Sequence, residues 1–238
     1  MTLKESLARE PFTLALSSGF FGFFAHCGVM MALDDEDLKP EKITGSSAGA
    51  IVAAAWSHGV LAQELKLVLK ELRKADFWDP GLGAGLLRGE KLEALLREVL
   101  KGRPQTTPIA ISVFDIFSRK TMSFSEGDIP KFVRASVAVP LMFHPVRLGR
   151  RLYWDGGILD KMALNSVGPE DRTLVHYLPG QGLHSVYERA RDVRALTPRQ
   201  TMLAIDDLPR VGPNALDRGL YAIEHAYEKT RKALDCDV

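Results

Sequence analysis

Short apolar segments alternate along this chain with longer segments whose apolar residues recur at helical spacing. The short segments predict strands at residues 12–17, 42–44, 109–114, 120–124, 146–148, 152–154, 174–178 and 202–205. The helical spacing predicts helices at residues 20–33, 48–58, 61–72 and 92–100, a helix that starts at Asp128, and a final helix over about 214–234. Strands that alternate with helices predict an α/β fold in which a mostly parallel sheet is covered on both faces.

The pattern shows neither an internal repeat nor a linker. We therefore expect one domain over residues 1–238. The polar stretch 181–199 is weakly periodic, which favours a mobile flap or partial disorder.

Composition narrows the class of protein. Hydrophobic residues make up 46% of the chain and the formal net charge is +1, so charge alone predicts no attraction to nucleic acid or to anionic membranes. Cys27 and Cys236 lack the spacing of metal ligands and favour a reducing compartment.

The first residues contain no signal-peptide apolar stretch, and the apolar run 20–33 is too short to span a bilayer. We expect a cytoplasmic protein. The cluster Arg147, Arg150 and Arg151 is expected to be a solvated hairpin.

A candidate nucleophile lies in Gly45-Ser46-Ser47-Ala48-Gly49, which fits the pattern G-x-S-x-G between a predicted strand and a predicted helix. A serine that projects from such a sharp turn needs small neighbours, and Gly45 and Gly49 meet this need. The amino end of the following helix presents free N–H groups, which favour negative charge at the reacting centre.

A serine needs a base to accept its proton, and two arrangements are open. Asp155, followed by Gly156 and Gly157, stands at the end of a predicted strand and could accept the proton directly. Alternatively, Ser47, Asp155 and either His176 or His184 follow the order of an α/β-hydrolase triad. Basicity alone favours the triad, because a carboxyl pKa is normally lower than that of histidine. Asp160, close to the same turn, is expected to be solvated.

Several segments in one order resemble the patatin-like phospholipase family. They are Leu14–Gly19 with Ala25–Val29, Ile43–Ile51, Gly85–Gly89, Arg134–Val146 and Asp155–Ile158, all within residues 12–165. The resemblance implies a three-layer α/β/α sandwich and a Ser47–Asp155 dyad without histidine. It implies hydrolysis of acyl esters of lipids, as by a phospholipase A or a lysophospholipase, with no metal or organic cofactor. The implied partner is a lipid or acyl-ester substrate, with transient contact at a membrane surface.

The first loop departs from the family pattern of several glycines and a basic residue. It reads Ser17-Ser18-Gly19-Phe20-Phe21-Gly22-Phe23-Phe24 and contains no basic residue. The backbone N–H groups of Ser18, Gly19 and Phe20 are still the expected oxyanion hole, because an amide donates whatever its side chain is. If the altered loop no longer supports chemistry, the alternative is a lipid-binding protein without activity. Because the four phenylalanines cannot all face one side of a helix, at least one is expected to line the substrate cleft or its entry surface.

Overall fold

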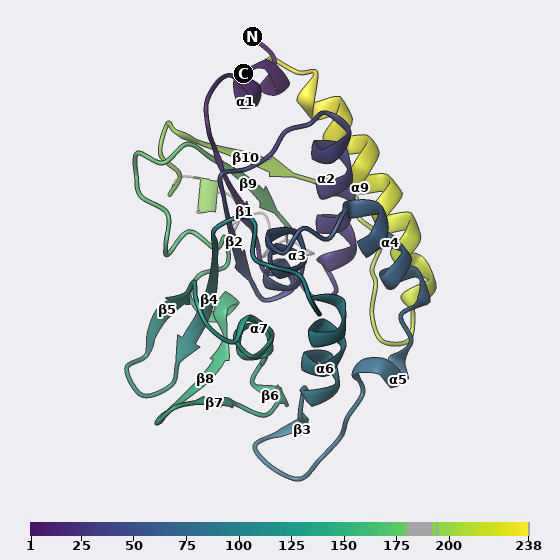
Figure 1. Ribbon diagram of the computed structural model, residues 1–238, viewed down its shortest axis with the longest axis vertical. Coiled ribbons are helices and arrows are strands. Elements are labelled where there is room, and N and C mark those ends of the chain that lie inside the picture. Colours follow the sequence, from purple (N-terminus) through teal and green to yellow (C-terminus); the bar gives the residue numbers. More distant parts are fainter. Residues whose placement is uncertain (180–191, 194, 238) are drawn as a thin grey trace.

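The computed structural model describes residues 1–179, 192–193 and 195–237. A central, mostly parallel sheet is flanked by helices (Figure 1), which confirms the predicted α/β fold class. His184 and most of the predicted flap 181–199 lie outside the described residues.

The larger part of the sheet consists of five parallel strands. In spatial order these are β10 (Gln200–Ala204), β9 (Thr173–Tyr177), β1 (Thr13–Leu16), β2 (Lys42–Ser46) and β4 (Ile109–Asp115). Every residue of β1 and of β9 is buried, which explains why these strands are continuous apolar segments rather than alternating ones. Three antiparallel strands complete the sheet: β8 (Arg151–Asp155), β7 (Val146–Leu148) and β5 (Lys120–Phe124).

Strands β2 and β8 follow one another along the same edge of β4. Strand β2 pairs in parallel with Ile109–Ser112, and β8 pairs in antiparallel with Val113–Asp115. Strand β5 pairs with residues of both stretches and must therefore occupy the opposite edge of β4. Since β2 and β8 run toward each other, their carboxyl ends meet. This places the residue after β2, Ser47, beside the last residue of β8, Asp155.

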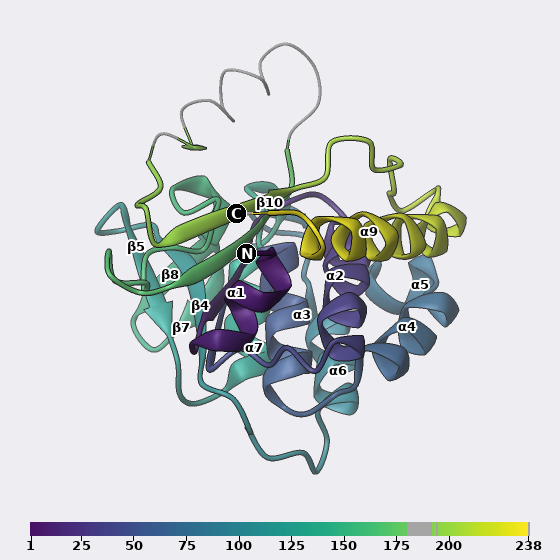
Figure 2. The same ribbon diagram turned by 90° about the horizontal axis from the view of Figure 1, so that it is seen from above.

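The helices that flank the sheet are seen from above in Figure 2. They are α1 (Leu3–Arg9), α2 (Phe23–Asp35), α3 (Ala48–Ser57), α4 (Ala62–Glu71), α5 (Lys74–Phe77), α6 (Glu90–Val99), α7 (Ile129–Ser136) and α9 (Gly219–Leu234). Helix α2 lies along α9 (Figures 1 and 2), and the two pack so closely that a Cβ on Gly28 would lie 2.2 Å from the Ile223 carbonyl oxygen. This packing explains why α2 is apolar all round.

The predicted C-terminal helix begins later than its pattern indicates. A 3₁₀ turn (Leu216–Arg218) precedes α9, and the side-chain oxygen of Asn214 accepts a hydrogen bond from Lys74 Nζ at 3.1 Å instead of capping the helix. The short strands β3 (Gly85–Leu87) and β6 (Leu141–Phe143) form a separate parallel pair that the sequence pattern did not predict.

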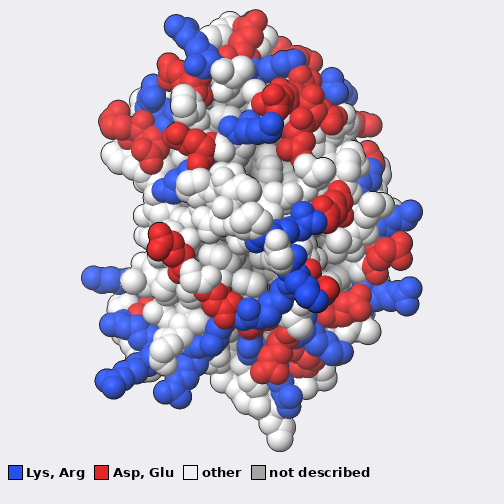
Figure 3. Space-filling view, in the orientation of Figure 1, with Lys and Arg blue, Asp and Glu red and all other residues white. Residues whose placement is uncertain are grey.

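Charged side chains are unevenly spread over the surface. In Figure 3, Lys and Arg gather at the lower left, over β5, β7 and β8. Arg147, Arg150 and Arg151 are exposed in or beside the β7–β8 turn, as predicted for a solvated hairpin. None of the helices in the described part of the chain has the length and apolar content that a bilayer span requires.

Candidate active site

Ser47 occupies a strained turn between β2 and α3. Its backbone has φ +51° and ψ −117°, a conformation that is costly for a residue with a side chain and that holds its hydroxyl out of the turn. The two glycines of the motif are required by close contacts. A Cβ on Gly49 would lie 2.0 Å from the Leu16 carbonyl oxygen, and one on Gly45 would lie 2.7 Å from Ala50 Cα. The turn can therefore form only with small residues at these positions.

The Ser47 hydroxyl donates a hydrogen bond to Asp155 Oδ2 at 2.7 Å. The other carboxyl oxygen, Oδ1, accepts from the Gly157 N–H at 2.7 Å. Gly156 is equally constrained, because a Cβ there would lie 2.1 Å from the Ser112 carbonyl oxygen. The structure thus brings together Ser47, Asp155 and the two glycines that the sequence singled out.

Burial changes the acidity of the Asp155 carboxyl. The side chain is only 5% exposed, and this burial raises its pKa from 3.8 to about 6. The hydrogen bonds from Ser47 and Gly157 favour the carboxylate and limit the rise. Asp155 is therefore a stronger base than an exposed aspartate.

Two buried serines and an aspartate support this turn, and sequence reasoning missed all three. Ser136 Oγ accepts from the Ser47 N–H at 2.9 Å and donates to the Ser112 carbonyl oxygen at 2.7 Å. Ser112 Oγ in turn donates to Asp160 Oδ2 at 2.5 Å. The expectation that Asp160 is solvated is wrong, because it is 9% exposed and also accepts two backbone N–H groups. The only sequence signal was the position of Ser136 within the segment Arg134–Val146.

The structure of the first loop shows that one of the three predicted oxyanion donors, Ser18, was wrong. The Ser18 N–H donates to the Lys161 carbonyl oxygen at 2.7 Å and is therefore already occupied. Within the described residues, the N–H groups of Gly19 and Phe20 donate to no other group. A hydrogen bond from the Gly22 N–H to the Gly19 carbonyl oxygen, 2.9 Å long, closes a tight turn that ends at the start of α2. Gly19 and Phe20 remain as candidate donors.

The described histidines do not complete a triad. His176 is fully buried, and its Nδ1 lies 2.7 Å from Nδ1 of His26, while the Asp155 oxygens are held by Ser47 and Gly157. The geometry therefore does not support the triad through His176. The alternative through His184 falls outside the described residues.

An apolar cavity opens from Ser47 and runs along α3. Its lining includes Ile51 and Ala55 of α3, Leu65 and Leu69 of α4, and Leu92 and Leu96 of α6. Ala55 lies eight residues beyond Ser47, which corresponds to about 12 Å along a helix. Phe20, Phe21 and Phe23 also line this cavity, whereas Phe24 is buried against Gly219. The prediction that at least one of these phenylalanines lines the cleft is confirmed.

A second, wider cavity reaches Ser47 and Asp155 from the other side of the first loop. Both cavities are lined by Gly19, Phe20, Phe21, Ser47 and Val139. The lining of the wider cavity includes two basic residues, Lys161 and Arg210. Lys161 Nζ also donates to the Tyr177 hydroxyl at 2.9 Å. Ser47 therefore lies where an apolar and a more polar cavity join.

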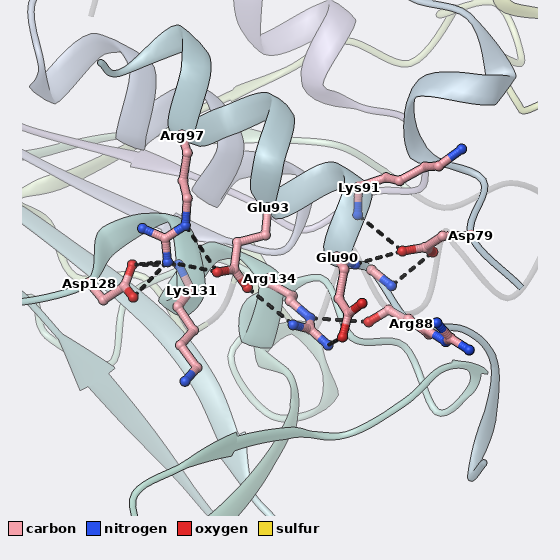
Figure 4. Close-up of polar contacts among 10 residues, drawn as sticks. Asp79, Arg88, Glu90, Lys91, Glu93, Arg97, Asp128, Lys131 and Arg134 are labelled. Atoms are coloured by element: carbon pink, nitrogen blue, oxygen red, sulfur yellow. Dashed lines mark hydrogen bonds and ion pairs between the residues drawn. The ribbon is translucent and has the colours of Figure 1, made fainter. Parts of the chain in front are cut away.

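A polar network holds the outer face of α6, whose apolar face lines the first cavity (Figure 4). Glu93 accepts from Arg97 at 2.7 Å and from Arg134 of α7 at 3.2 Å, and Arg97 also pairs with Asp128 at 2.7 Å. The Asp79 carboxylate caps α6 by accepting three backbone N–H groups at its start. These contacts fix one wall of the cavity.

Comparison with known proteins places these motifs in a family. Residues 14–167 match the model for the patatin-like phospholipases, more than half of the chain, so the resemblance seen in the sequence is confirmed. An uncharacterized NTE-family protein of Mycobacterium tuberculosis is 32% identical over 158 residues, which is 63% of this chain and 44% of that protein. A second NTE-family protein of the same organism is 26% identical over 68% of this chain and 29% of its own length. The chain thus spans less than half the length of these relatives.

Two solved structures share the fold. VipD from Legionella pneumophila aligns with a TM-score of 0.68 over 95% of this chain and 67% of its own, at 14% identity. ExoU of the Pseudomonas aeruginosa type III secretion system, in complex with SpcU, aligns with a TM-score of 0.55 over 94% of this chain and 51% of its own, at 16% identity.

Proposed function

Because the chain belongs to the patatin-like phospholipase family, we propose that it is a lipid acyl hydrolase that cleaves carboxylic esters with Ser47 and Asp155. The observation that carries this proposal is the 2.7 Å hydrogen bond from the Ser47 hydroxyl to the Asp155 carboxylate, at the head of α3. A nucleophile in hydrogen-bond contact with a base is the arrangement that covalent catalysis requires.

The reaction proceeds in two steps. Ser47 Oγ attacks the ester carbonyl carbon while its proton passes to Asp155. The resulting oxyanion is stabilised by the N–H groups of Gly19 and Phe20, which have no other acceptor among the described residues. When the carbon–oxygen bond breaks, Asp155 returns the proton to the departing alcohol and leaves an acyl-Ser47. Asp155 then takes a proton from water, whose oxygen attacks the acyl carbon. When the bond from that carbon to Ser47 Oγ breaks, Asp155 returns the proton to Ser47 and the fatty acid is released.

The environment of Asp155 suits it to this role without a histidine. An ordinary aspartate is a weak base near neutral pH, but burial raises the pKa of Asp155 to about 6. Its second oxygen stays bonded to the Gly157 N–H, which keeps the carboxylate oriented toward Ser47.

The two cavities fit the two halves of a lipid ester. With the carbonyl carbon at Ser47, the acyl chain lies in the apolar cavity along α3 and the alcohol portion in the wider cavity. Lys161 and Arg210 in the wider cavity favour an alcohol that carries negative charge, such as the phosphate of a phospholipid or lysophospholipid.

The proposal is tested with a serine-reactive fluorophosphonate and a panel of phospholipids, lysophospholipids and neutral lipids. We expect labelling and turnover in the native protein, and loss of both in Ser47→Ala. Ser166→Ala is the matched control, because the Ser166 hydroxyl has no hydrogen-bond partner within the described residues. Turnover that persists in Ser47→Ala would refute the proposal. Fatty-acid binding without labelling of the native protein would instead indicate a lipid-binding protein.

A further inference from the structure

Two fully buried histidines contact each other beneath the first loop. His26 of α2 and His176 of β9 are both 0% exposed, and their Nδ1 atoms lie 2.7 Å apart. His26 Nε2 lies 2.8 Å from the Ser17 carbonyl oxygen. Neither histidine bonds to Ser47 or Asp155 within the described residues. The pair therefore has no part in the proton transfers described above.

The contacts determine where each histidine carries its proton. A carbonyl oxygen only accepts, so His26 must donate to Ser17 from Nε2 and carry its proton there. Burial lowers the pKa of His26 to about 4 and lowers that of His176 as well, so both rings are neutral near pH 7. A neutral His26 has a bare Nδ1, and the proton shared between the two rings then belongs to His176. His176 Nε2 keeps a lone pair and has no partner within the described residues.

The Ser17 carbonyl oxygen belongs to the peptide group directly before the proposed oxyanion donors. The same peptide group carries the Ser18 N–H, which donates to the Lys161 carbonyl oxygen at 2.7 Å. One peptide plane is thus held at both ends, by His26 on one side and by Lys161 on the other. The next peptide group carries the Gly19 N–H.

Further contacts hold Ser17 itself. Its N–H donates to the His176 carbonyl oxygen at 3.1 Å, and its Oγ accepts from the Leu178 N–H at 2.9 Å. The Leu178 side chain lies so close to the turn that a Cβ on Gly19 would be 2.6 Å from its Cδ1. Among the groups that bond to Ser17, the His26 imidazole is a side chain, so it can be replaced without removing a backbone hydrogen bond.

We propose that the His26–His176 pair positions the oxyanion hole. His176 donates to His26 and so fixes the tautomer that donates to Ser17, and this bond orients the peptide group that precedes the Gly19 N–H. The inference rests on the proposed function. It makes His26 and His176 positioning residues, which act through the first loop and do not touch the substrate.

The energetic reason for this arrangement lies in preorganisation. Oxyanion donors are effective only when they already point at the place where negative charge develops. The first loop lacks the usual run of glycines and contains Phe21 at φ +56°, so its local sequence alone does not hold the turn at low cost. A rigid imidazole pair supplies the constraint.

The test compares variants that remove the hydrogen bond with variants that preserve it. His26→Leu removes the donor to Ser17, whereas His26→Gln can place an amide N–H close to the same point. His176→Leu and His176→Asn form the corresponding pair for the contact with His26. For each variant we measure kcat and KM for a chromogenic acyl ester, the affinity for a trifluoromethyl ketone that forms a tetrahedral adduct with Ser47, the affinity for free fatty acid, and Tm.

We expect His26→Leu to lower kcat about tenfold to a hundredfold, less than the complete loss of an oxyanion donor. The affinity for the ketone should fall by a similar factor, while KM and fatty-acid affinity stay within about twofold, because only the tetrahedral state uses the oxyanion hole. His26→Gln should recover most of the loss. If His26→Leu does not fold, His176→Leu against His176→Asn gives the same comparison.

An unchanged kcat in a folded His26→Leu and His176→Leu would overturn the inference. So would a parallel fall in kcat, fatty-acid affinity and Tm without recovery in the amide variants, since that pattern marks a packing role. A native protein with neither turnover nor fluorophosphonate labelling would instead refute the proposed function, and this inference with it.

Discussion

Replacement of Asp155 by asparagine should abolish activity and raise the stability of the fold. Burial raises the pKa of this carboxyl from 3.8 to about 6. Because a rise of one in pKa corresponds to about 1.4 kcal/mol, keeping the carboxylate charged in the folded protein well above pH 6 costs about 3 kcal/mol. Asparagine has nearly the same shape and no charge. We therefore expect Asp155→Asn to be inactive and, at pH 8, more stable by up to about 3 kcal/mol.

The gain should depend on pH in a defined way. A carboxyl whose folded pKa is raised contributes stability that is fully present below its unfolded pKa of 3.8 and is lost as pH rises through about 6. At pH 4.5 the native protein is already largely protonated at Asp155, so the advantage of the variant should shrink to about 1 kcal/mol.

Thermal and urea unfolding of the native protein and of the variant at pH 8, 6 and 4.5 would measure this difference. For a chain of this size, about 3 kcal/mol corresponds to a rise in Tm of about 6–12 °C at pH 8. Ser47→Ala is the matched control, because it abolishes activity and leaves the buried charge in place. A gain that is absent at pH 8, that does not change with pH, or that is equal in Ser47→Ala would refute the reasoning.

Four further perturbations follow from the site. Below about pH 6, kcat/KM of the native protein should fall tenfold per pH unit as Asp155 is protonated, and a profile flat to pH 5 would contradict its role as base. Gly49→Ala places a Cβ 2.0 Å from a carbonyl oxygen and should abolish labelling or folding, whereas Gly212→Ala, with its nearest neighbour at 3.9 Å, should change Tm little. Ala55→Phe should block the far part of the apolar cavity and reduce kcat/KM for esters with long acyl chains at least tenfold, while kcat/KM for short esters changes little. An equal loss for both would count against placing the acyl chain in this cavity. Glu93→Ala should lower the free energy of unfolding by about 1–3 kcal/mol because it leaves Arg134 without this partner, whereas Glu98→Ala, in an exposed pair, should change it by less than about 0.5 kcal/mol in urea unfolding.

The parts of the site that could be predicted from the sequence are those with local causes. The turn at Ser47 needs small residues within four positions, and Asp155 is marked by the two glycines that follow it. The strands before both residues are continuous or alternating apolar segments. These signals lie within a few residues of each other, so a pattern can carry them.

The remaining parts depend on contacts between distant segments. Ser18 loses its role as an oxyanion donor because Lys161, 143 positions later, accepts from its N–H. Asp160 is buried because Ser112 and two backbone N–H groups surround its carboxylate. The pairing joins His26 of α2 to His176 of β9, 150 positions later. No local pattern contains this information.

Short elements were missed for a different reason. Strands β3 and β6 have three residues each and pair with each other across 56 positions, so no local turn marks them. Strand β7 is equally short but was predicted because the turn at Gly149 joins it directly to β8. In the first loop, by contrast, the phenylalanines predicted more helix than the structure contains. Their apolar character predicted a helix from Phe20, whereas the turn closed by Gly19 and Gly22 delays α2 until Phe23.

Because β2 and β8 pair with the same edge of β4, this one strand sets the positions of both Ser47 and Asp155. Because β2 and β8 are both registered against the same strand, a slip of one residue in either pairing would displace Ser47 or Asp155 by about 3.4 Å and turn its side chain to the opposite face of the sheet. Insertions or deletions inside β4 should therefore be far less tolerated than changes of length in the turn that follows it. That turn can lengthen without changing how β2 or β8 pairs with β4.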